Sequence, residues 1–545
     1  MTNIDFLPTS EPETVNFDDV AVLLHPSDDV AVAKRTLTAG TMLRASAATP
    51  AVRVDALIPT GHKFAVRAAP AGQTVRRYGQ VIGFAKSDIR LGDHVHLHNL
   101  GLGTLSLDYA FCSDVPVVEF VAPEQRRTFM GYRRADGRSG TRNYLAIISS
   151  VNCSAHTVRK IAHHFTAERL ADFPNVDGVI AIAHGFGCAT RAGSDDYTLL
   201  QRTLAGIAIH PNIGGYILVG LGCETNQLSE LISNYQLAWK DAPVVRRQAI
   251  SANGGAAPAV LPPPSLYIQE SGGIRKTIDA GIELVQSLLP AVNKNKREAV
   301  PVSGLTVALQ CGGSDGWSGV TANPALGVAC DTLVQNGGSV VLAETPEVYG
   351  AEHMLTRRAV TREVGEKLIN KIKWWERHAA KHGVEIDNNP SAGNKVGGLT
   401  TIYEKSLGAV AKAGNTPLNA VYEYAEQVRS PGFSFMDSPG YDPVGATGQA
   451  AGGCNLIVFT TGRGSCFGFK PAPSIKVASN SVMYERMTSD MDVNAGRVLD
   501  GVSLHEVGAE IFEKIVAVAS GQPSLSEAQG VGEEEFQPWN LGGIL

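Results

Sequence analysis

The sequence predicts an α/β protein in which a small N-terminal β-clip domain precedes two α/β domains with mainly parallel sheets. Residues 17–100 hold short alternating apolar segments with regularly spaced glycines, which is typical of a small barrel or β-clip. From residue 130 a buried strand, a turn and a helix recur three times, and a second α/β series begins near residue 300. A chain of 545 residues also exceeds the size of one hydrophobic core.

The elements of the first half follow from the local patterns. We expect a polar tail over 1–16, the β-clip domain over 17–100, a linker over 101–129 and the first α/β domain over 130–290. Three apolar runs in that domain are predicted strands: "NYLAIISSVNC", "VDGVIAIAHGFGC" and "GGYILVGLGC". The stretch "SAHTVRKIAHHFTAERL" has apolar residues at about 3.6-residue spacing and predicts a helix.

The second half repeats the pattern after a break. Residues 243–274 include "GGAAPAVLPPPS", which predicts a long surface loop or linker. The second α/β domain is expected over 300–545, with strands at "LTVALQ", "GSVVLAE" and "NLIVFTTGRGS". Its long helix, "TREVGEKLINKIKWWERHAAKHG", ends at a glycine, as helices commonly do.

Composition excludes several classes of function. The net charge is −6, and the chain has no run of Lys and Arg, so we expect no nucleic-acid partner. No apolar run reaches the length of a membrane span, so we expect no membrane partner. The N-terminus is polar and acidic, unlike a secretion signal, and the cytoplasm is the expected location.

Cysteines follow the predicted strands in a repeated position. Cys153, Cys188 and Cys223 each close a strand of the first α/β domain, and Cys311 closes the strand "LTVALQ". Ligands bind beyond the carboxyl ends of parallel strands, so we expect these thiols to converge on one crevice. Thiolates bind iron or an iron–sulfur cluster, and we favour Cys188, Cys223 and Cys311 for this role. The alternative is that they are unrelated buried thiols; the other four cysteines (112, 330, 454 and 466) are expected to be structural.

Histidines and glycine-rich turns supply further candidates. "HVHLHN" puts His94, His96 and His98 on one face of a strand, which suits a metal or an anion, and His62 lies in the same domain. The turns "CGGSDGWSG", "NPSAGNKVGG", "SPGYDPVGATG" and "TTGRGS" can direct backbone N–H groups at an anion. None matches a P-loop or a dinucleotide-binding fingerprint, so a small anionic ligand with many hydroxyls, such as a sugar acid, fits better. The alternative is that the glycines only form tight turns.

The motifs "GYRRADGRSGTRN", "HGFGC", "GLGCETNQ", "CGGSDGWSGVTANPALG", "NPSAGNKVGG" and "FTTGRGS" resemble the altronate/galactarate dehydratase family over nearly the whole chain. The N-terminal domain resembles the SAF-type β-clip of that family, and "GDHVHLHN" resembles the altronate dehydratases most. The resemblance implies a carbon–oxygen hydro-lyase that dehydrates a sugar acid, with altronate favoured and galactarate or another acid as the alternative. It also implies activation by a divalent metal, with iron favoured, as a single ion or an iron–sulfur cluster.

Under this interpretation each candidate residue has an expected role. His62 and His184 are the expected acid and base, because an imidazole can exchange protons near neutral pH. Lys395 and Arg463 are expected to clamp the carboxylate, and Ser314, Asp315 and Asn394 to contact hydroxyls. The expected metal ligands are Cys188, Cys223 and Cys311, with Glu224, His94 and His96 as the alternatives for a single iron.

Two further expectations concern the protein as a whole. The only expected partner is the small-molecule sugar acid, apart from other copies of the chain in a homo-oligomer. A function of another class, a non-catalytic sugar-acid binding protein, also fits this scaffold. The joint presence of His, Cys and Lys candidates argues against that alternative, since a chain that had lost catalysis would be expected to lose some of them.

Overall fold

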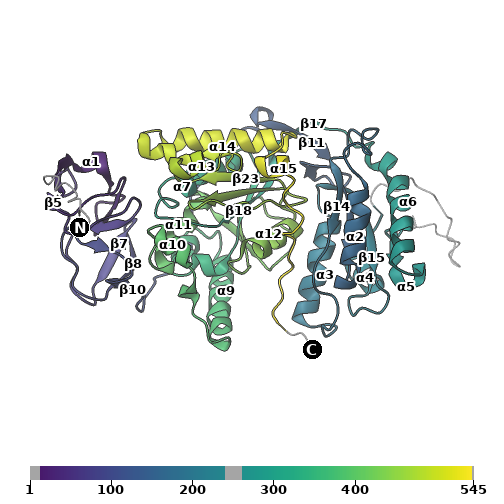
Figure 1. Cartoon of the computed structure of the whole chain (residues 1–545), viewed down its shortest axis with the longest axis horizontal. Coiled ribbons are helices and arrows are strands. Elements are labelled where there is room, and N and C mark those ends of the chain that lie inside the picture. Colours follow the sequence, from purple (N-terminus) through teal and green to yellow (C-terminus); the bar gives the residue numbers. More distant parts are fainter. Residues whose placement is uncertain (1–12, 240–260, 543–545) are drawn as a thin grey trace, which may run out of the picture.

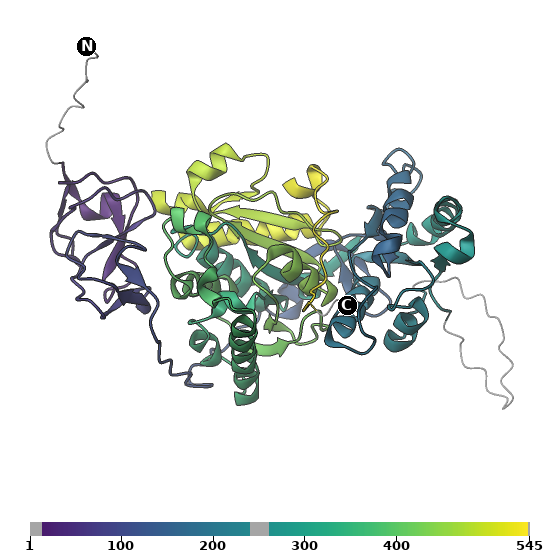
Figure 2. The ribbon, with the colours of Figure 1, turned by 60° about the horizontal axis from the view of Figure 1, so that its bottom comes forward.

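The structure, a computed structural model, describes residues 13–239 and 261–542. The predicted fold class is confirmed: a small β domain is followed by two parallel α/β sheets. Figures 1 and 2 show the β domain at one end of the molecule, the C-terminal α/β unit in the middle and the first α/β unit at the other end. Most of the tail expected over 1–16 and most of the loop expected over 243–274 lie outside the described residues.

Ten short strands and one helical turn form the N-terminal domain. They are β1 (Thr14–Asn16), α1 (Phe17–Val20), β2 (Ala21–Val22), β3 (Val30–Ala33), β4 (Met42–Arg44), β5 (Val52–Arg53), β6 (Lys63–Ala65), β7 (Thr74–Arg77), β8 (Gln80–Ala85), β9 (His94–Val95) and β10 (Leu100–Gly101). The strands make three small sheets, in the orders β1-β4-β5, β10-β8-β7 and β2-β3-β6-β9. Phe17, Leu43 and Phe64 centre a separate small core. Gly92 is required at its turn, where φ is +88° and a Cβ would lie 1.8 Å from the Arg53 carbonyl oxygen.

The expected linker runs along the C-terminal unit. Cys112 N donates to Thr356 O at 3.1 Å, and Val121 N donates to Gln335 O at 2.8 Å. After the short helix η1 (Pro123–Gln125), β11 (Thr128–Arg133) pairs antiparallel with β12 (Ser139–Gly140) and β17 (Glu298–Pro301). These hydrogen bonds hold the connection against the C-terminal unit.

The first α/β unit is a four-stranded parallel sheet with the order β14-β13-β15-β16. Its strands are β13 (Tyr144–Ser149), β14 (Gly178–Ile182), β15 (Ile213–Gly220) and β16 (Ser265–Tyr267), and its helices are α2 (Asn152–His164), α3 (Asp195–Ala208), α4 (Leu228–Tyr235), α5 (Ile268–Ser271) and α6 (Ile274–Val292). Helices α2 and α6 share one core with the sheet, and α3 and α4 share another on the opposite face. The prediction of a loop over 243–274 was wrong in its last part, because β16 and α5 lie there. The prolines just before them hid this strand in the sequence, and its pairing partner is β15.

The C-terminal unit is built on a seven-stranded parallel sheet with the order β20-β21-β19-β18-β22-β23-β24. Its strands are β18 (Thr306–Cys311), β19 (Ser339–Leu342), β20 (Leu418–Tyr422), β21 (Gly432–Met436), β22 (Leu456–Thr461), β23 (Ser474–Ala478) and β24 (Val493–Asn494). The helices used below are α7 (Ala322–Gln335), α9 (Arg362–Lys381), α10 (Ala392–Val396), α11 (Ile402–Val410), α12 (Asp442–Ala451) and α14 (Leu504–Ala519). The others are η2 (Val302–Gly304), η3 (Thr345–Val348), α8 (His353–Thr356), η4 (Ile386–Asn388), η5 (Ala411–Ala413), α13 (Ser481–Arg486), η6 (Ala495–Asp500) and α15 (Leu525–Ala528).

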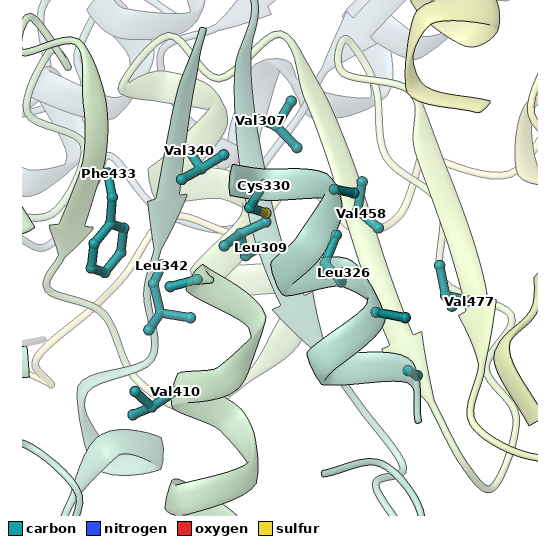
Figure 3. Packing of buried hydrophobic residues seen from close by; sticks show 14 of the residues in the cluster. Val307, Leu309, Leu326, Cys330, Val340, Leu342, Val410, Phe433, Val458 and Val477 are labelled. Atoms are coloured by element: carbon teal, nitrogen blue, oxygen red, sulfur yellow. The ribbon is translucent and has the colours of Figure 1, made fainter. Parts of the chain in front are cut away.

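Branched and aromatic side chains bury both faces of this sheet. On the face covered by α7, Leu326 and Cys330 of α7 pack on Val307 and Leu309 of β18, with Val340 of β19 beside them (Figure 3). Continuous apolar strands of this kind are typical of a parallel sheet covered on both faces. The other face packs on α12, which in turn packs on α3 of the first unit. Within the described ranges, no helix is both long and apolar enough to cross a membrane.

Candidate active site

Two neighbouring strands of the seven-stranded sheet end beside a buried cluster of ionisable side chains. Strand β18 ends at Cys311, and β19 ends at Leu342, just before Glu344 and the helical turn that holds Glu347. The strands pair in register, so their carboxyl ends open on the same edge of the sheet. This edge is where ligands bind in open α/β sheets.

A cavity of about 410 Å³ lies at this edge. Cys311, Glu347, Lys405 and Asp442 contribute to its polar lining, and Trp375 and His378 of α9 line it as well. The other lining residues are Gly312, Gly313, Pro346, Ala379, Val384, Glu385, Ile386, Asn388, Asn389, Ser391, Asn394 and Gly440. A volume of this size fits a small ligand such as a six-carbon acid.

Three buried donors meet beside the cavity. The Cys311 sulfur and one carboxylate oxygen each of Glu344 and Glu347 all lie within 4.8 Å of one another. The Cys311 thiol donates to Glu347 Oε2 at 3.4 Å. Both carboxylate oxygens of Glu344 are buried without a hydrogen-bond partner. A buried carboxylate without partners requires a proton or a cation, since its desolvation is otherwise uncompensated.

Two lysines approach the same carboxylates from α11 and the turn that follows it. Lys405 Nζ donates to Glu347 Oε1 at 2.6 Å and to Asn389 Oδ1 at 2.8 Å. Lys412 Nζ lies 3.9 Å from Glu344 Oε2. Both lysines are buried, so their charges act on the carboxylates with little screening by water.

The environment separates the protonation states of these acids. Burial raises the pKa of Glu344 well above its ordinary value, and the nearby Glu347 raises it further. Burial also acts to raise the pKa of Glu347, but Lys405 and Lys412 outweigh it and hold that pKa below its ordinary value. Burial and the Glu347 charge raise the pKa of Asp442 to about 6. Acids whose pKa values are driven apart in one site can serve as general acid and general base.

The three donors also fit a metal ion. Burial raises the pKa of the Cys311 thiol to about 12, so without a cation the sulfur stays protonated. A divalent ion would remove that proton and would neutralise the unpartnered oxygens of Glu344. One sulfur and two carboxylates form a mixed donor set that suits a first-row transition metal better than Mg²⁺ or Ca²⁺.

Of the residues predicted from the sequence, Cys311 and Asn394 line this cavity. Asn394 Nδ2 donates to Ser314 O at 2.7 Å, so Ser314 contributes a backbone contact here. The buried carboxylate of Asp315 binds the hydroxyls of Ser318 and Ser479, both within 2.9 Å. That network organises the turn after β18.

A second, larger cavity lies on the other side of that turn. It measures about 690 Å³ and is lined by Asp315 and Arg463 together with Lys34, Arg35 and Thr60 of the N-terminal domain. Arg463 therefore opens on a different cavity from Cys311.

The histidine side chains of the N-terminal domain lie close together, and two of them contact helix α10. His62 Nδ1 lies 3.1 Å from His94 Nε2, and the ring centroids of His62 and His96 are 4.9 Å apart. His62 Nε2 donates to Val396 O at 3.1 Å, and His96 Nε2 donates to Lys395 O at 2.9 Å. Burial lowers the pKa of His94 to about 3 and that of His96 to about 4, so both rings are neutral. The N-terminal domain thus holds α10, whose Ser391 and Asn394 line the first cavity.

The remaining candidates lie on the four-stranded sheet. Both ring nitrogens of buried His184 are engaged, one donating to Ser149 O at 2.9 Å and the other accepting from Phe186 N at 3.1 Å. Glu224 accepts from Ser150 Oγ at 2.8 Å and from backbone N–H groups. Cys188 and Cys223 are exposed at this sheet. The structure does not bring them to Cys311, because each of the two parallel sheets has its own carboxyl edge.

Four residues of the candidate site were missed from the sequence: Glu347, Lys405 and Asp442 line the cavity, and Glu344 lies beside it. The strand-end argument that selected Cys311 applies equally to "GSVVLAETPE", so a signal for the two glutamates was present. Asp442 opens helix α12 inside the glycine-rich turn "SPGYDPVGATG". Lys405 lies in helix α11 between Glu404 and Ser406 and carried no local signal.

Comparisons with known proteins match the whole architecture. Three family models cover the chain: "Altronate/galactarate dehydratase SAF domain" over residues 19–102, "D-galactarate dehydratase/Altronate hydrolase, second domain" over 131–293, and "D-galactarate/Altronate dehydratase, C-terminal" over 302–544. The altronate dehydratase of Bacillus subtilis (strain 168) is 35% identical over 503 residues, 92% of this chain and 95% of that protein.

Two proteins of Escherichia coli (strain K12) are similar as well. Its altronate dehydratase is 34% identical over 93% of this chain and 96% of the relative. Its galactarate dehydratase (L-threo-forming) is 35% identical over 85% of this chain and 86% of the relative. With this identity over almost the full length, the chain belongs to the altronate/galactarate dehydratase family.

Proposed function

We propose that this protein is a hydro-lyase that removes water from a sugar acid, with altronate as the favoured substrate and a 2-keto-3-deoxy acid as the product. The cavity at the ends of β18 and β19 supports the proposal best, because carboxyl groups with different pKa values and buried lysines meet at this place. Dehydration of a hydroxy acid needs a base for the proton beside the carboxylate and an acid for the departing hydroxide. The developing negative charge on the carboxylate needs a cationic partner.

Each step has a candidate group in the cavity. Asp442, with a pKa of about 6, is a carboxylate at neutral pH and is the proposed base. Glu344, whose pKa is raised by burial, holds a proton only while no metal is bound. Lys405 uses two of its three N–H donors on Glu347 and Asn389, and the third is available to the substrate carboxylate.

A divalent metal, with iron favoured, would be held by Cys311, Glu344 and Glu347. When bound, it supplies positive charge that stabilises the developing enolate of the substrate. Glu344 gives up its proton when it binds the metal. In the metal-loaded enzyme we therefore assign the acid role to His378, which lines the cavity, and Glu344 serves as a metal ligand.

The roles that we expected for the other candidate residues remain proposals. Asn394, which lines the cavity, is supported as a substrate contact. His62 and His96 act through α10, because they contact its backbone, and Lys395 stays a proposed clamp for the substrate carboxylate. His184 and Glu224 are engaged in local hydrogen bonds, and an acid–base role for His184 requires that these break.

The test is turnover of altronate and of galactarate by protein prepared without oxygen and supplied with ferrous iron. Formation of a 2-keto-3-deoxy acid supports the proposal, and Glu344→Gln should abolish it. Glu352→Gln is the matched control: it is another buried glutamate whose pKa burial raises, to about 7, but it is not one of the three grouped donors beside the cavity. Binding of both acids without turnover would instead favour a sugar-acid binding protein. The cytoplasmic location and homo-oligomeric state stay predictions, which fractionation and light scattering test.

A further inference from the structure

Three neighbouring strands of the four-stranded sheet each lead into an exposed cysteine. Cys153 lies in the first turn of α2, after β13, whereas Cys188 follows β14 and Cys223 follows β15. The sheet order β14-β13-β15 puts these three parallel strand ends side by side. Adjacent strands lie about 4.8 Å apart, so three neighbouring ends span about 10 Å.

Hydrogen bonds join the three loops into one layer. Asn152 N donates to Phe186 O at 2.8 Å, which links the Cys153 loop to the Cys188 loop. Asn226 N donates to Gly187 O at 3.0 Å, and Asn226 Nδ2 donates to Ser150 O at 2.9 Å. The Cys223 loop is thereby bonded to both of the others. The three thiols therefore start from backbone segments in direct contact.

The loops hold these thiols in an uncommon setting. Free cysteine is among the most buried residue types, as Cys330 and Cys454 are here, yet the three cysteines at this edge are exposed. Ala189, next to Cys188, has φ of +56° although it is not glycine. Backbone in such a conformation is costly and concentrates at functional sites. Gly187, on the other side, has φ of +100°, and a Cβ there would lie 2.3 Å from Ser150 O.

The spacing of these thiols distinguishes a cluster from a single ion. A single ion bound by thiolates at about 2.3 Å needs its donors within about 4 Å of one another. Throughout residues 13–239 and 261–542, only Cys311, Glu344 and Glu347 form a group of three donors within 4.8 Å. In an iron–sulfur cluster each thiolate binds a different iron, so wider spacing is required.

Two polar side chains near these loops are already engaged in hydrogen bonds. His184 and Glu224, which lie near these loops, already use their polar atoms in hydrogen bonds. Gln269 Nε2 donates to Cys223 Sγ at 3.3 Å, a contact of the kind that tunes cluster sulfurs. Cys153 lies in the first turn of a 13-residue helix, whose N-terminal end is a favourable position for a negatively charged group.

We propose that Cys153, Cys188 and Cys223 bind a four-iron iron–sulfur cluster in which one iron has no protein ligand. Binding deprotonates the three thiols and releases their protons to solvent. The open iron accepts an oxygen ligand, either water or the carboxylate or hydroxyl of a small acid. This centre is separate from the cavity at Cys311, and its presence does not depend on the reaction proposed there.

Acid-labile sulfide in the full-length protein is the direct readout, because the cavity at Cys311 can take up iron but not sulfide. Protein reconstituted without oxygen with equal amounts of ferrous and ferric iron and with sulfide should hold about four sulfides per chain and absorb in the visible range. Cys188→Ser should lose most of both, and Cys153→Ala should do the same if the serine variant does not fold. Cys466→Ser is the matched control, since Cys466 is also exposed but lies in the C-terminal unit.

The open iron has its own test. Ferricyanide should take one electron from the cluster and release one Fe²⁺, which leaves a three-iron cluster with its characteristic electron paramagnetic resonance signal. An iron held by a fourth protein ligand would resist this loss. Absence of labile sulfide in the native chain, or full sulfide in folded Cys188→Ser, would overturn the proposal. A cluster that keeps all its iron under ferricyanide would overturn the open position.

Discussion

The substitution Glu404→Gln should both loosen the N-terminal domain and weaken the candidate site. Glu404 of α11 is fully buried between two cations of the N-terminal domain, Lys63 at 3.0 Å and Arg77. Lys63 Nζ also donates to Gly398 O at 2.6 Å, and Arg77 donates to Gly316 O at 2.7 Å. These bonds join the β domain to the turns around the cavity.

Two estimates of the magnitude agree. Burial acts to raise the pKa of Glu404, but Lys63 and Arg77 outweigh it and lower the pKa from 4.5 to about 2. At about 1.4 kcal/mol per pKa unit, this difference corresponds to about 3 kcal/mol of stability. Removing one partner of a buried ion pair costs about 3–5 kcal/mol, because the other charge is left uncompensated.

The two cations do not contribute equally. Burial lowers the pKa of Lys63 to about 8, although Glu404 opposes the change, whereas the pKa of Arg77 is raised above its ordinary value. Both cations share one carboxylate, and only the guanidinium stays charged at every accessible pH. We therefore attribute most of the coupling to Arg77 and expect Lys63→Met to cost less than Arg77→Met.

Denaturant unfolding at several pH values measures the effect. The folded-state pKa of Glu404 is depressed, so its contribution is complete above about pH 4.5 and disappears as the pH falls toward 2. Glu404→Gln should lose about 3 kcal/mol at pH 7, with a smaller deficit at acid pH, and proteolysis of the linker should accelerate. A loss below about 1 kcal/mol with unchanged linker protection would refute this account of domain docking.

Three further predictions concern the cavity. Lys405→Met should lower kcat/KM at least about 100-fold, as expected when a cation opposite developing charge is removed, and steady-state kinetics on altronate measure it. If Asp442 is the base, kcat/KM should fall below pH of about 6, and Asp442→Asn should remove this limb from the pH profile. His96→Phe should raise KM or lower kcat by a moderate factor through the lost bond to Lys395 O, with metal content unchanged; loss of bound metal would instead make His96 a ligand.

Local patterns in the sequence were sufficient for the fold class. Period-two segments predicted the β domain, and repeated strand–turn–helix patterns predicted the parallel sheets. Strand β16 escaped because three residues pair with β15 after a proline-rich stretch, and nothing in "SLY" alone indicates that partner. Pairing over such a sequence distance is a tertiary property.

The sequence predicted a residue of the site only where that residue directly follows an apolar strand. Cys311 was selected because it closes an apolar strand, and Glu344 could have been found in the same way. The expected convergence of Cys188 with Cys311 assumed one shared crevice, whereas their strands belong to different sheets. Lys405 faces the glutamates only through the packing of α11, which no local pattern encodes. The histidines at period two do cluster, but the strand predicted through all three ends at Val95, and of the three only His96 contacts the backbone of α10.

The central claim is that Cys311, Glu344 and Glu347 hold the metal that assists dehydration. Anomalous diffraction at the iron absorption edge, from crystals grown without oxygen in ferrous iron, tests it most directly. The account predicts a peak between the Cys311 sulfur and the carboxylates of Glu344 and Glu347, absent in Glu344→Gln. Active protein with no iron peak in this cavity would contradict it.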